Sequence, residues 1–282
     1  MSNTSLDSDP PASPLLPLET YRIKSLPPNA YYIPSFLTPQ ESTTLLLQIS
    51  NHPWTSLTHR RLQPHPAPLT PSGHLLTTKS LPEYLVSPII DRILSLSFTS
   101  PCSSSVESGS DKNGNGIFTN SPHSRPNHVL INEYPPGTGI SPHEDGAAYF
   151  PVVCTVSLGA HIILQVTPKR KDTIDDNSNR EEEENNPPKI YKIFQEPNSL
   201  LITTDEMYTE HLHGIEAVEV DEGLTDKTVA NWELLGDETK IRILEGGGRV
   251  RREEVRISLT YRDVLKVKDA GKVFGGRVLG RR

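Results

Sequence analysis

A histidine and an aspartate two positions apart, His143 and Asp145, have the residue types and spacing best suited to chemistry in this chain. They follow the run from Asn132 to Pro142, in which a Pro-Pro-Gly turn ends an apolar stretch. Residues two apart on extended backbone point to the same side, so this imidazole and this carboxylate can contact one cation. The pair alone is a weak signal, because His-x-Asp often occurs by chance.

A metal site needs a third ligand, and His161, His211 and His213 are the histidines further along the chain. His161 stands in a Gly-Ala-His-Ile-Ile run, where a satisfied structural histidine is the better interpretation. His211 and His213 would share one face of an extended strand, so spacing does not choose between them. Gly214 lets the backbone bend tightly beside His213, which favours His213 in a crowded site. Two histidines and one carboxylate on one side of a metal, with open positions opposite, are typical of non-heme Fe(II) oxygenases.

The segment from Arg256 to Arg262 alternates strictly between polar and apolar residues. The residues on its polar face are Arg256, Ser258, Thr260 and Arg262. Two arginines inside a barrel are costly unless anions meet them. The strand separates their Cα atoms by about 20 Å, so two inward-leaning side chains could bracket a five-carbon diacid. Asn132 and Tyr134 share one face of their own strand and could donate to the same diacid. The alternative is an exposed sheet face with ordinary surface charges.

Helices are predicted only in the first third of the chain. Thr38 as N-cap, Pro39 at the first position and Glu41 at the third form a capping box that starts a helix ending near residue 51. A second helix is predicted from about residue 82 to residue 96, and Pro88 inside it should kink or shorten it. These helices would flank the strands that carry the candidate site.

Beyond residue 126 the pattern favours strands at 127–134, 152–158, 162–166, 190–194, 199–203, 214–220 and 256–262. Their turn-punctuated spacing predicts a mainly β (α+β) fold, an antiparallel sandwich or barrel with flanking N-terminal helices. Residues 1–26 are rich in proline and serine and are expected to be disordered. Flexible insertions are expected at about 99–126, 168–189 and 221–250, and a basic tail at 269–282. The span 27–268, with these insertions inside it, would be one domain.

The bulk composition fits one large domain with irregular additions. The chain has 282 residues, of which 34% are hydrophobic and 26 are prolines. Its two cysteines, Cys102 and Cys154, argue against a disulfide scaffold and favour a reducing compartment. No apolar run approaches about 18 residues, and the acidic start lacks the apolar core of a secretory signal. We therefore expect a cytoplasmic or nuclear protein with no membrane partner.

The ordered array of these motifs resembles the AlkB family of 2-oxoglutarate- and Fe(II)-dependent dioxygenases. The motifs are Asn132-x-Tyr134, His143-x-Asp145, His213-Gly-Ile and Arg256-x-Ser-x-Thr-x-Arg262. Longer strings are most similar to its homolog 6 subgroup, namely NHVLINEYPPGTGISPHEDG, YFPVVCTVSLG, LHGI, RISLTYR, Tyr31-Tyr-Ile-Pro-Ser-Phe36 and Arg60-Arg61-Leu62-Gln63. The resemblance spans roughly residues 30–268. It implies a double-stranded β-helix, a jelly-roll-like sandwich with flanking helices.

The resemblance also implies a cofactor set and a role for each motif. His143, Asp145 and His213 would ligate Fe(II), while Asn132, Tyr134, Arg256 and Arg262 would hold the co-substrate 2-oxoglutarate, with O2 as oxidant. By analogy Arg256 would take the far carboxylate and Arg262 would lie nearer the metal, although these two roles could be swapped. The implied reaction is oxidative demethylation or hydroxylation of a methylated nucleic acid or protein. The alternative is a non-catalytic binding or scaffold module on the same fold.

Two positions depart from the family pattern. Asn is common in the family where Ser258 stands, a change that the homolog 6 subgroup shares. Several nucleic-acid repair members carry a second acid two residues after the ligand aspartate, where this chain has Ala147. The oxidation centre is therefore predicted more firmly than the substrate.

Overall fold

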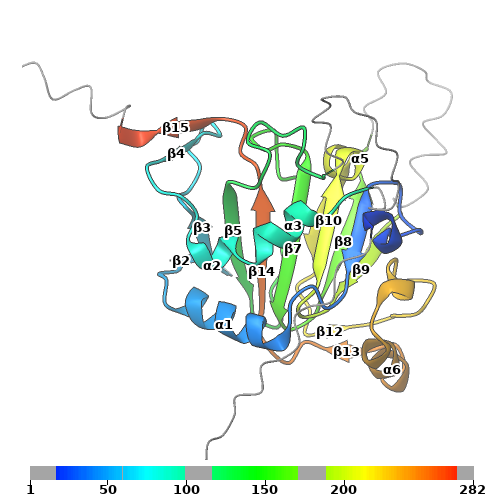
Figure 1. Cartoon of the computed structure of the whole chain (residues 1–282). Coiled ribbons are helices and arrows are strands. Elements are labelled where there is room, and N and C mark those ends of the chain that lie inside the picture. Colours follow the sequence, from blue (N-terminus) through cyan, green and yellow to red (C-terminus); the bar gives the residue numbers. More distant parts are fainter. Residues whose placement is uncertain (1–16, 59, 99–115, 171–188, 272–282) are drawn as a thin grey trace, which may run out of the picture.

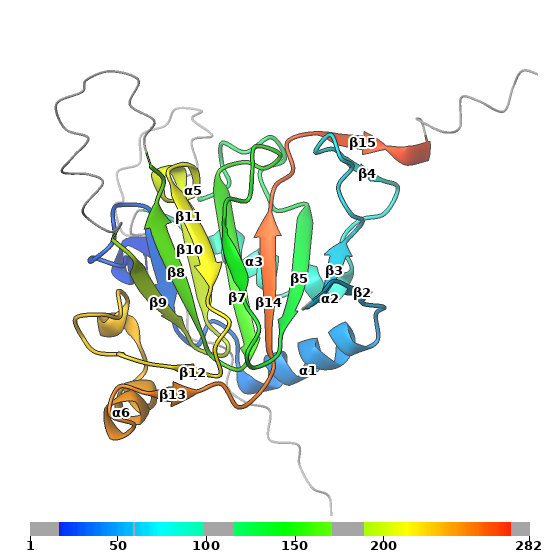
Figure 2. The ribbon, with the colours of Figure 1, turned by 180° about the vertical axis from the view of Figure 1, so that it is seen from behind.

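The structure is a computed structural model that describes residues 17–58, 60–98, 116–170 and 189–271. Its described strands form two main antiparallel sheets that face each other and do not close into a barrel (Figures 1 and 2). The large sheet has the order β1 (Ala30–Ile33), β10 (Leu200–Thr204), β7 (Val152–Gly159), β14 (Arg256–Arg262), β5 (His128–Tyr134), β3 (Arg61–His65) and β2 (Thr55–Ser56). The small sheet has the order β6 (Ile140–His143), β11 (His211–Ile215), β8 (Ile162–Pro168) and β9 (Tyr191–Gln195). This jelly-roll-like sandwich is the predicted fold class.

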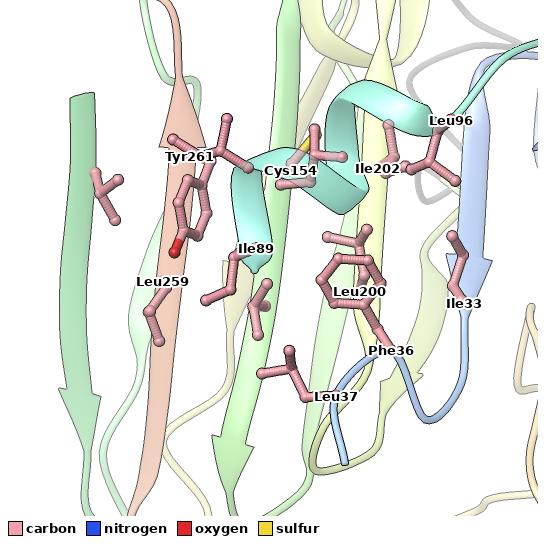
Figure 3. Close-up of a cluster of buried hydrophobic side chains, with 14 of the residues drawn as sticks. Ile33, Phe36, Leu37, Ile89, Leu96, Cys154, Leu200, Ile202, Leu259 and Tyr261 are labelled. Atoms are coloured by element: carbon pink, nitrogen blue, oxygen red, sulfur yellow. The ribbon is translucent and has the colours of Figure 1, made fainter. Parts of the chain in front are cut away.

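The outer face of the large sheet is apolar because its strands alternate. Leu259 and Tyr261 on β14 and Cys154 on β7 belong to the main core cluster, to which the helices α1 (Pro39–Ser50), α2 (Glu83–Val86) and α3 (Ile89–Ser95) also contribute. Figure 3 shows Ile89 of α3 lying over β7 and β14, and Leu96, just after α3, lying beside Ile202 of β10. Each large side chain buried this way contributes about 1.5–3 kcal/mol. The polar residues of the same strands must therefore face the small sheet.

Both helix predictions are confirmed in their main features. The Thr38 side chain accepts from the Glu41 amide at 3.2 Å, and Glu41 accepts from the Thr38 amide at 2.9 Å, which completes the capping box. The second predicted helix is divided at Pro88 into α2 and α3. The backbone extends at Ser87, as expected for a residue before proline.

The expectation of an unpacked insertion at 221–250 is wrong. This span holds the end of β12 (Val220–Asp221), the 3-10 helix η2 (Trp232–Leu234), α6 (Asp237–Glu245) and the start of β13 (Val250–Arg251). Leu224, Leu235 and Ile243 are buried in a second core cluster, which also contains Phe194 of β9. Because its apolar residues are widely spaced among polar ones, the segment shows no clear period. Its core contacts form with residues distant in the sequence, among them those of β9 and β8.

Three other expected boundaries also need correction. Part of the N-terminal segment is folded, because residues 17–26 contain the 3-10 helix η1 (Leu18–Tyr21) and buried Leu18 and Ile23. The end of the 99–126 insertion places Phe118 in the main core cluster. The strand predicted at 214–220 runs instead over β11, directly after the short helix α5 (Asp205–Thr209), and β12 is a separate strand. The remainder of these expected irregular segments, 1–16, 99–115 and 171–188, lies outside the described residues.

The last described strand is β15 (Val267–Asp269), which pairs in parallel with β4 (Leu75–Thr77). Residues 272–282 of the predicted basic tail lie outside the described residues. Within the part of the chain that the structure describes, no helix is long and apolar enough to cross a membrane.

Candidate active site

A cavity of about 320 Å³ lies between the inner faces of the two sheets. It is lined by all of the predicted site residues, namely Asn132, Tyr134, His143, Asp145, His213, Arg256 and Arg262. The large sheet supplies the arginines, Asn132 and Tyr134, because β14 and β5 pair with Tyr134 opposite Arg256 and Asn132 opposite Ser258. The small sheet supplies the two histidines from β6 and β11. The exposed-face alternative for the arginines is wrong, since both side chains are buried.

The histidine pair is made by the pairing of β6 with β11. His143 and His213 are direct partners in this ladder, and their ring centroids lie 4.4 Å apart. Gly214 permits this approach, because a Cβ there would lie 2.9 Å from the backbone nitrogen of Pro142. The Nδ1 of His143 lies 2.8 Å from the carbonyl oxygen of Ser141, which can only accept. Nδ1 must therefore carry the proton, which leaves the Nε2 lone pair free for a metal.

The other candidate histidines are placed differently. His211 also lines the cavity, and its Nδ1 lies 3.1 Å from the carbonyl oxygen of Glu206, a contact of the same kind as that of His143. The two histidines differ in the strand ladder, where His213 and not His211 is the partner of His143. His161 is buried outside the cavity, stacked on Phe194 with ring centroids 4.9 Å apart and 3.3 Å from Asp221. The interpretation of His161 as structural agrees with this position. Only the tertiary structure brings His213, rather than His211, beside His143.

Asp145 follows β6 and is held by an arginine from the opposite sheet. Its Oδ1 lies 2.7 Å from Arg262 Nη1 in an ion pair, and both side chains are largely buried. In residues 17–58, 60–98, 116–170 and 189–271, no three His, Cys, Asp or Glu side chains are gathered closely enough to hold a metal ion. The structure thus places the two imidazoles and the carboxylate in one cavity, with the carboxylate turned toward Arg262. The donor types fit Fe(II), and the assignment of ligands stays a prediction.

The buried arginines carry donors that the described side chains leave unsatisfied. Arg256 donates through Nη2 to Ser157 Oγ at 2.9 Å and to Gln195 Oε1 at 3.0 Å, but its Nε has no partner. The Nε of Arg262 also lacks a partner. A buried guanidinium N–H without an acceptor costs about 1–3 kcal/mol or more. A dianion between the two arginines would satisfy both, so the residues fit 2-oxoglutarate.

Burial controls the protonation of the cavity. It lowers the pKa of His213, against the opposing effect of Asp145, and so favours the neutral imidazole that binds metals. Burial also lowers the pKa of Arg256 to about 10, which still leaves the group charged at neutral pH. Burial raises the pKa of Tyr134, so its phenol remains a hydrogen-bond donor. The neutral imidazole of His213 beside charged guanidinium groups suits a cation and a dianion together.

Several residues around the site had no role in the sequence prediction. Tyr208 on α5 donates to the carbonyl oxygen of Gly146 at 2.6 Å, and the ammonium group of Lys169 contacts the carboxylate of Glu144. Both contacts tie the loop that carries Asp145 to the side of the small sheet. Tyr208 and Lys169 are distant from this loop in the sequence and lie in no recognisable motif, so no local signal identifies them.

Comparison with known proteins defines the class first. Residues 29–262 match the family described as the 2OG-Fe(II) oxygenase superfamily. The chain belongs to this superfamily, and it is an Fe(II)- and 2-oxoglutarate-dependent dioxygenase, an oxidoreductase that uses O2.

Its place within the superfamily follows from individual relatives. The chain is 33% identical over 268 residues to a Danio rerio protein named "Probable RNA/DNA demethylase ALKBH6", covering 92% of this chain and 95% of that protein. This relative places it in the AlkB type, as the resemblance predicted. It is also 25% identical, over 84% of this chain and 85% of the other, to uncharacterized protein L905 of Acanthamoeba polyphaga mimivirus.

Solved structures show weaker similarity. OsALKBH1 is 15% identical with a TM-score of 0.48, over 84% of this chain and 99% of the other. A Pseudomonas putida prolyl-4-hydroxylase is 9% identical with a TM-score of 0.44, over 88% of this chain and 98% of the other.

Proposed function

We propose that this dioxygenase oxidatively demethylates a methylated nucleic acid, with His143, Asp145 and His213 as the iron ligands. The observation that carries the ligand assignment is the shared cavity, in which two paired imidazoles and a carboxylate face two arginines with unsatisfied donors. The substrate class is supported by the Danio rerio relative, whose name describes a probable RNA/DNA demethylase. A methylated protein is the alternative substrate, and cytoplasm or nucleus is the proposed location.

The arginines would have separate roles toward 2-oxoglutarate. Arg256 lies opposite Tyr134 in the strand ladder, and its guanidinium carbon is 5.6 Å from the centre of that ring. Arg256 would hold the far carboxylate, with Tyr134 and Asn132 donating beside it. Arg262 contacts Asp145 and would therefore meet the end of the diacid that lies nearest the metal.

The bound iron and 2-oxoglutarate supply the oxidising power that removes hydrogen from a C–H bond of the substrate. The chain's own residues bind, orient and exclude water. Apolar side chains such as Leu164, Val166 and Ile215 line the cavity and keep stray water out. On an N-methyl group, hydroxylation followed by loss of formaldehyde amounts to demethylation.

Release of CO2 from labelled 2-oxoglutarate tests the iron centre without a substrate. Turnover should require Fe(II) and should be lost in His143→Ala. Iron content separates the two neighbouring histidines: His213→Ala should lose the metal, whereas His211→Ala should retain most of it. Equal retention by the two variants would contradict the ligand assignment.

Formaldehyde release from methylated oligonucleotides and from a panel of methylated peptides tests the substrate class. Oligonucleotide turnover that disappears in His143→Ala is expected. Turnover of peptides alone would replace nucleic acid by protein as the substrate. A wild-type protein that binds no iron would instead favour the scaffold alternative.

A further inference from the structure

Arg60 is a third guanidinium in the cavity, and it has no carboxylate partner among the described residues. It lines the same cavity as Arg256 and Arg262 and is partly buried. Its Nε donates a long hydrogen bond of 3.4 Å to the Asn132 Oδ1. The adjacent Arg61 is different, because Glu133 takes two of its donors at 2.5 and 2.6 Å and Trp54 stacks beneath it at 4.9 Å.

The charged groups of the cavity wall do not balance. Its described cations are Arg60, Arg256 and Arg262, and its described acids are Glu144 and Asp145. Asp145 is paired with Arg262, and Glu144 is paired with Lys169 at the rim. A ferrous ion and a 2-oxoglutarate dianion carry opposite and equal charges, so their binding leaves this positive surplus in place.

Tyr134 shows that these charges act together on one point in the cavity. Burial has the largest effect on its phenol and raises the pKa. Among the charges, Arg256, Arg60 and Arg262 lower that pKa, and only Asp145 opposes them. The guanidinium groups and the candidate ligand therefore share one weakly screened region, where a charge interacts strongly with its neighbours.

We propose that Arg60 is a specificity-determining residue that makes the cavity favour an uncharged methylated group over a cationic one. This inference rests on the proposed demethylation of nucleic acid and specifies its substrate class. A methyl group on a ring nitrogen of adenine gives a cation, whereas a methyl group on the exocyclic amine leaves the base neutral. The surplus charge repels the first kind and is indifferent to the second, and like charge brought into a desolvated site is a general means of excluding a ligand.

Two oligonucleotides of one sequence provide the test, one with a single N1-methyladenine and the other with a single N6-methyladenine. The wild type should show at least a tenfold higher kcat/KM for formaldehyde release from the neutral base. Arg60→Gln should reduce this ratio at least fivefold. Arg61→Gln, which removes a neighbouring charge already neutralised outside the cavity, should leave the ratio within twofold. Because both substrates use the same co-substrate, the ratio cancels any effect of Arg60 on 2-oxoglutarate.

Equal turnover of the two bases, preference for the cation, or an unchanged ratio in Arg60→Gln would overturn the proposal. Binding is a second readout, measured by fluorescence anisotropy of both oligonucleotides with the metal-free protein. If CO2 release continues while neither oligonucleotide is demethylated, the proposed nucleic-acid function fails. The dissociation constants of the two oligonucleotides then test by themselves whether the cavity prefers the neutral base over the cationic one. Tighter binding of the neutral base, lost in Arg60→Gln, supports the proposal, and tighter or equal binding of the cationic base overturns it.

Discussion

Replacing Arg252 by methionine should lower the free energy of unfolding by about 3–5 kcal/mol, because the change leaves a buried carboxylate without its cation. Arg252 donates to Asp221 through Nε at 2.8 Å and through Nη2 at 2.6 Å, and to the carbonyl oxygen of Glu216 at 2.9 Å. The two side chains are only 3% and 5% exposed. In the variant His161, at 3.3 Å from Asp221, would be the nearest remaining charge partner.

Urea denaturation of the variant beside a matched surface change measures this effect. Arg251→Met removes the neighbouring arginine, whose pair with Glu219 spans 3.2 Å between side chains 59% and 67% exposed. Such a pair contributes about 0–1 kcal/mol. The midpoint of unfolding should therefore fall far more for Arg252→Met than for Arg251→Met, without a change in the slope.

The pH response gives a second check on the same pair. Burial has the largest single effect and raises the pKa of Asp221, but the hydrogen bonds and charges of Arg252 and His161 together outweigh it, so the net pKa lies below the ordinary value. A carboxyl with a lowered pKa stabilises the fold above its unfolded pKa and loses that contribution as the pH falls through the folded value. Arg252→Met should abolish this loss of stability at low pH. Adding Asp221→Asn to Arg252→Met should recover part of the lost free energy of unfolding, because it removes the unpaired carboxylate. A loss below about 1 kcal/mol in Arg252→Met would refute the assignment of 221–252 as a packed segment.

Three further changes test the region of the site. Tyr208→Phe removes the hydrogen bond to Gly146, a loss of roughly 1 kcal/mol, and should weaken Mn(II) binding about fivefold. Electron paramagnetic resonance measures this affinity. An unchanged affinity would count against the role of Tyr208 in positioning the loop. Gly214→Ala would place a Cβ 2.9 Å from Pro142 and should cost about 1–3 kcal/mol and reduce metal binding; a wild-type unfolding midpoint would contradict this. Burial lowers the pKa of His128 to about 4, so stability is full above about pH 6.5 and falls by up to about 3 kcal/mol as the pH drops toward 4. His128→Leu should flatten part of that slope, and a slope identical to the wild type would show that His128 is not held neutral.

Features set by a few neighbouring residues were predictable from the chain. The alternation in Arg256 to Arg262 assigned both arginines to one face, since period two is a property of any strand. Thr38 and Glu41 specified a helix start because their hydrogen bonds join residues three apart. The effect of Pro88 was predictable for the same reason, because proline acts on its own turn of helix.

Features that depend on partners far along the chain were decided by tertiary structure. The choice of His213 over His211 depends on which residue of β11 pairs with His143, and both histidines have the same local spacing. The 221–252 segment has no clear period, and its burial depends on contacts with β9 and on the Asp221–Arg252 pair.

The charge balance of the cavity was also decided by the tertiary structure. Arg60 and Arg61 are adjacent and chemically identical in the sequence, yet only Arg60 lines the cavity, while Arg61 pairs with Glu133. The types and order of the reactive residues were therefore determined by the sequence, because short-range periodicity and capping are local. Their pairing, burial and net charge were determined only by the fold, because these depend on which distant strands become neighbours.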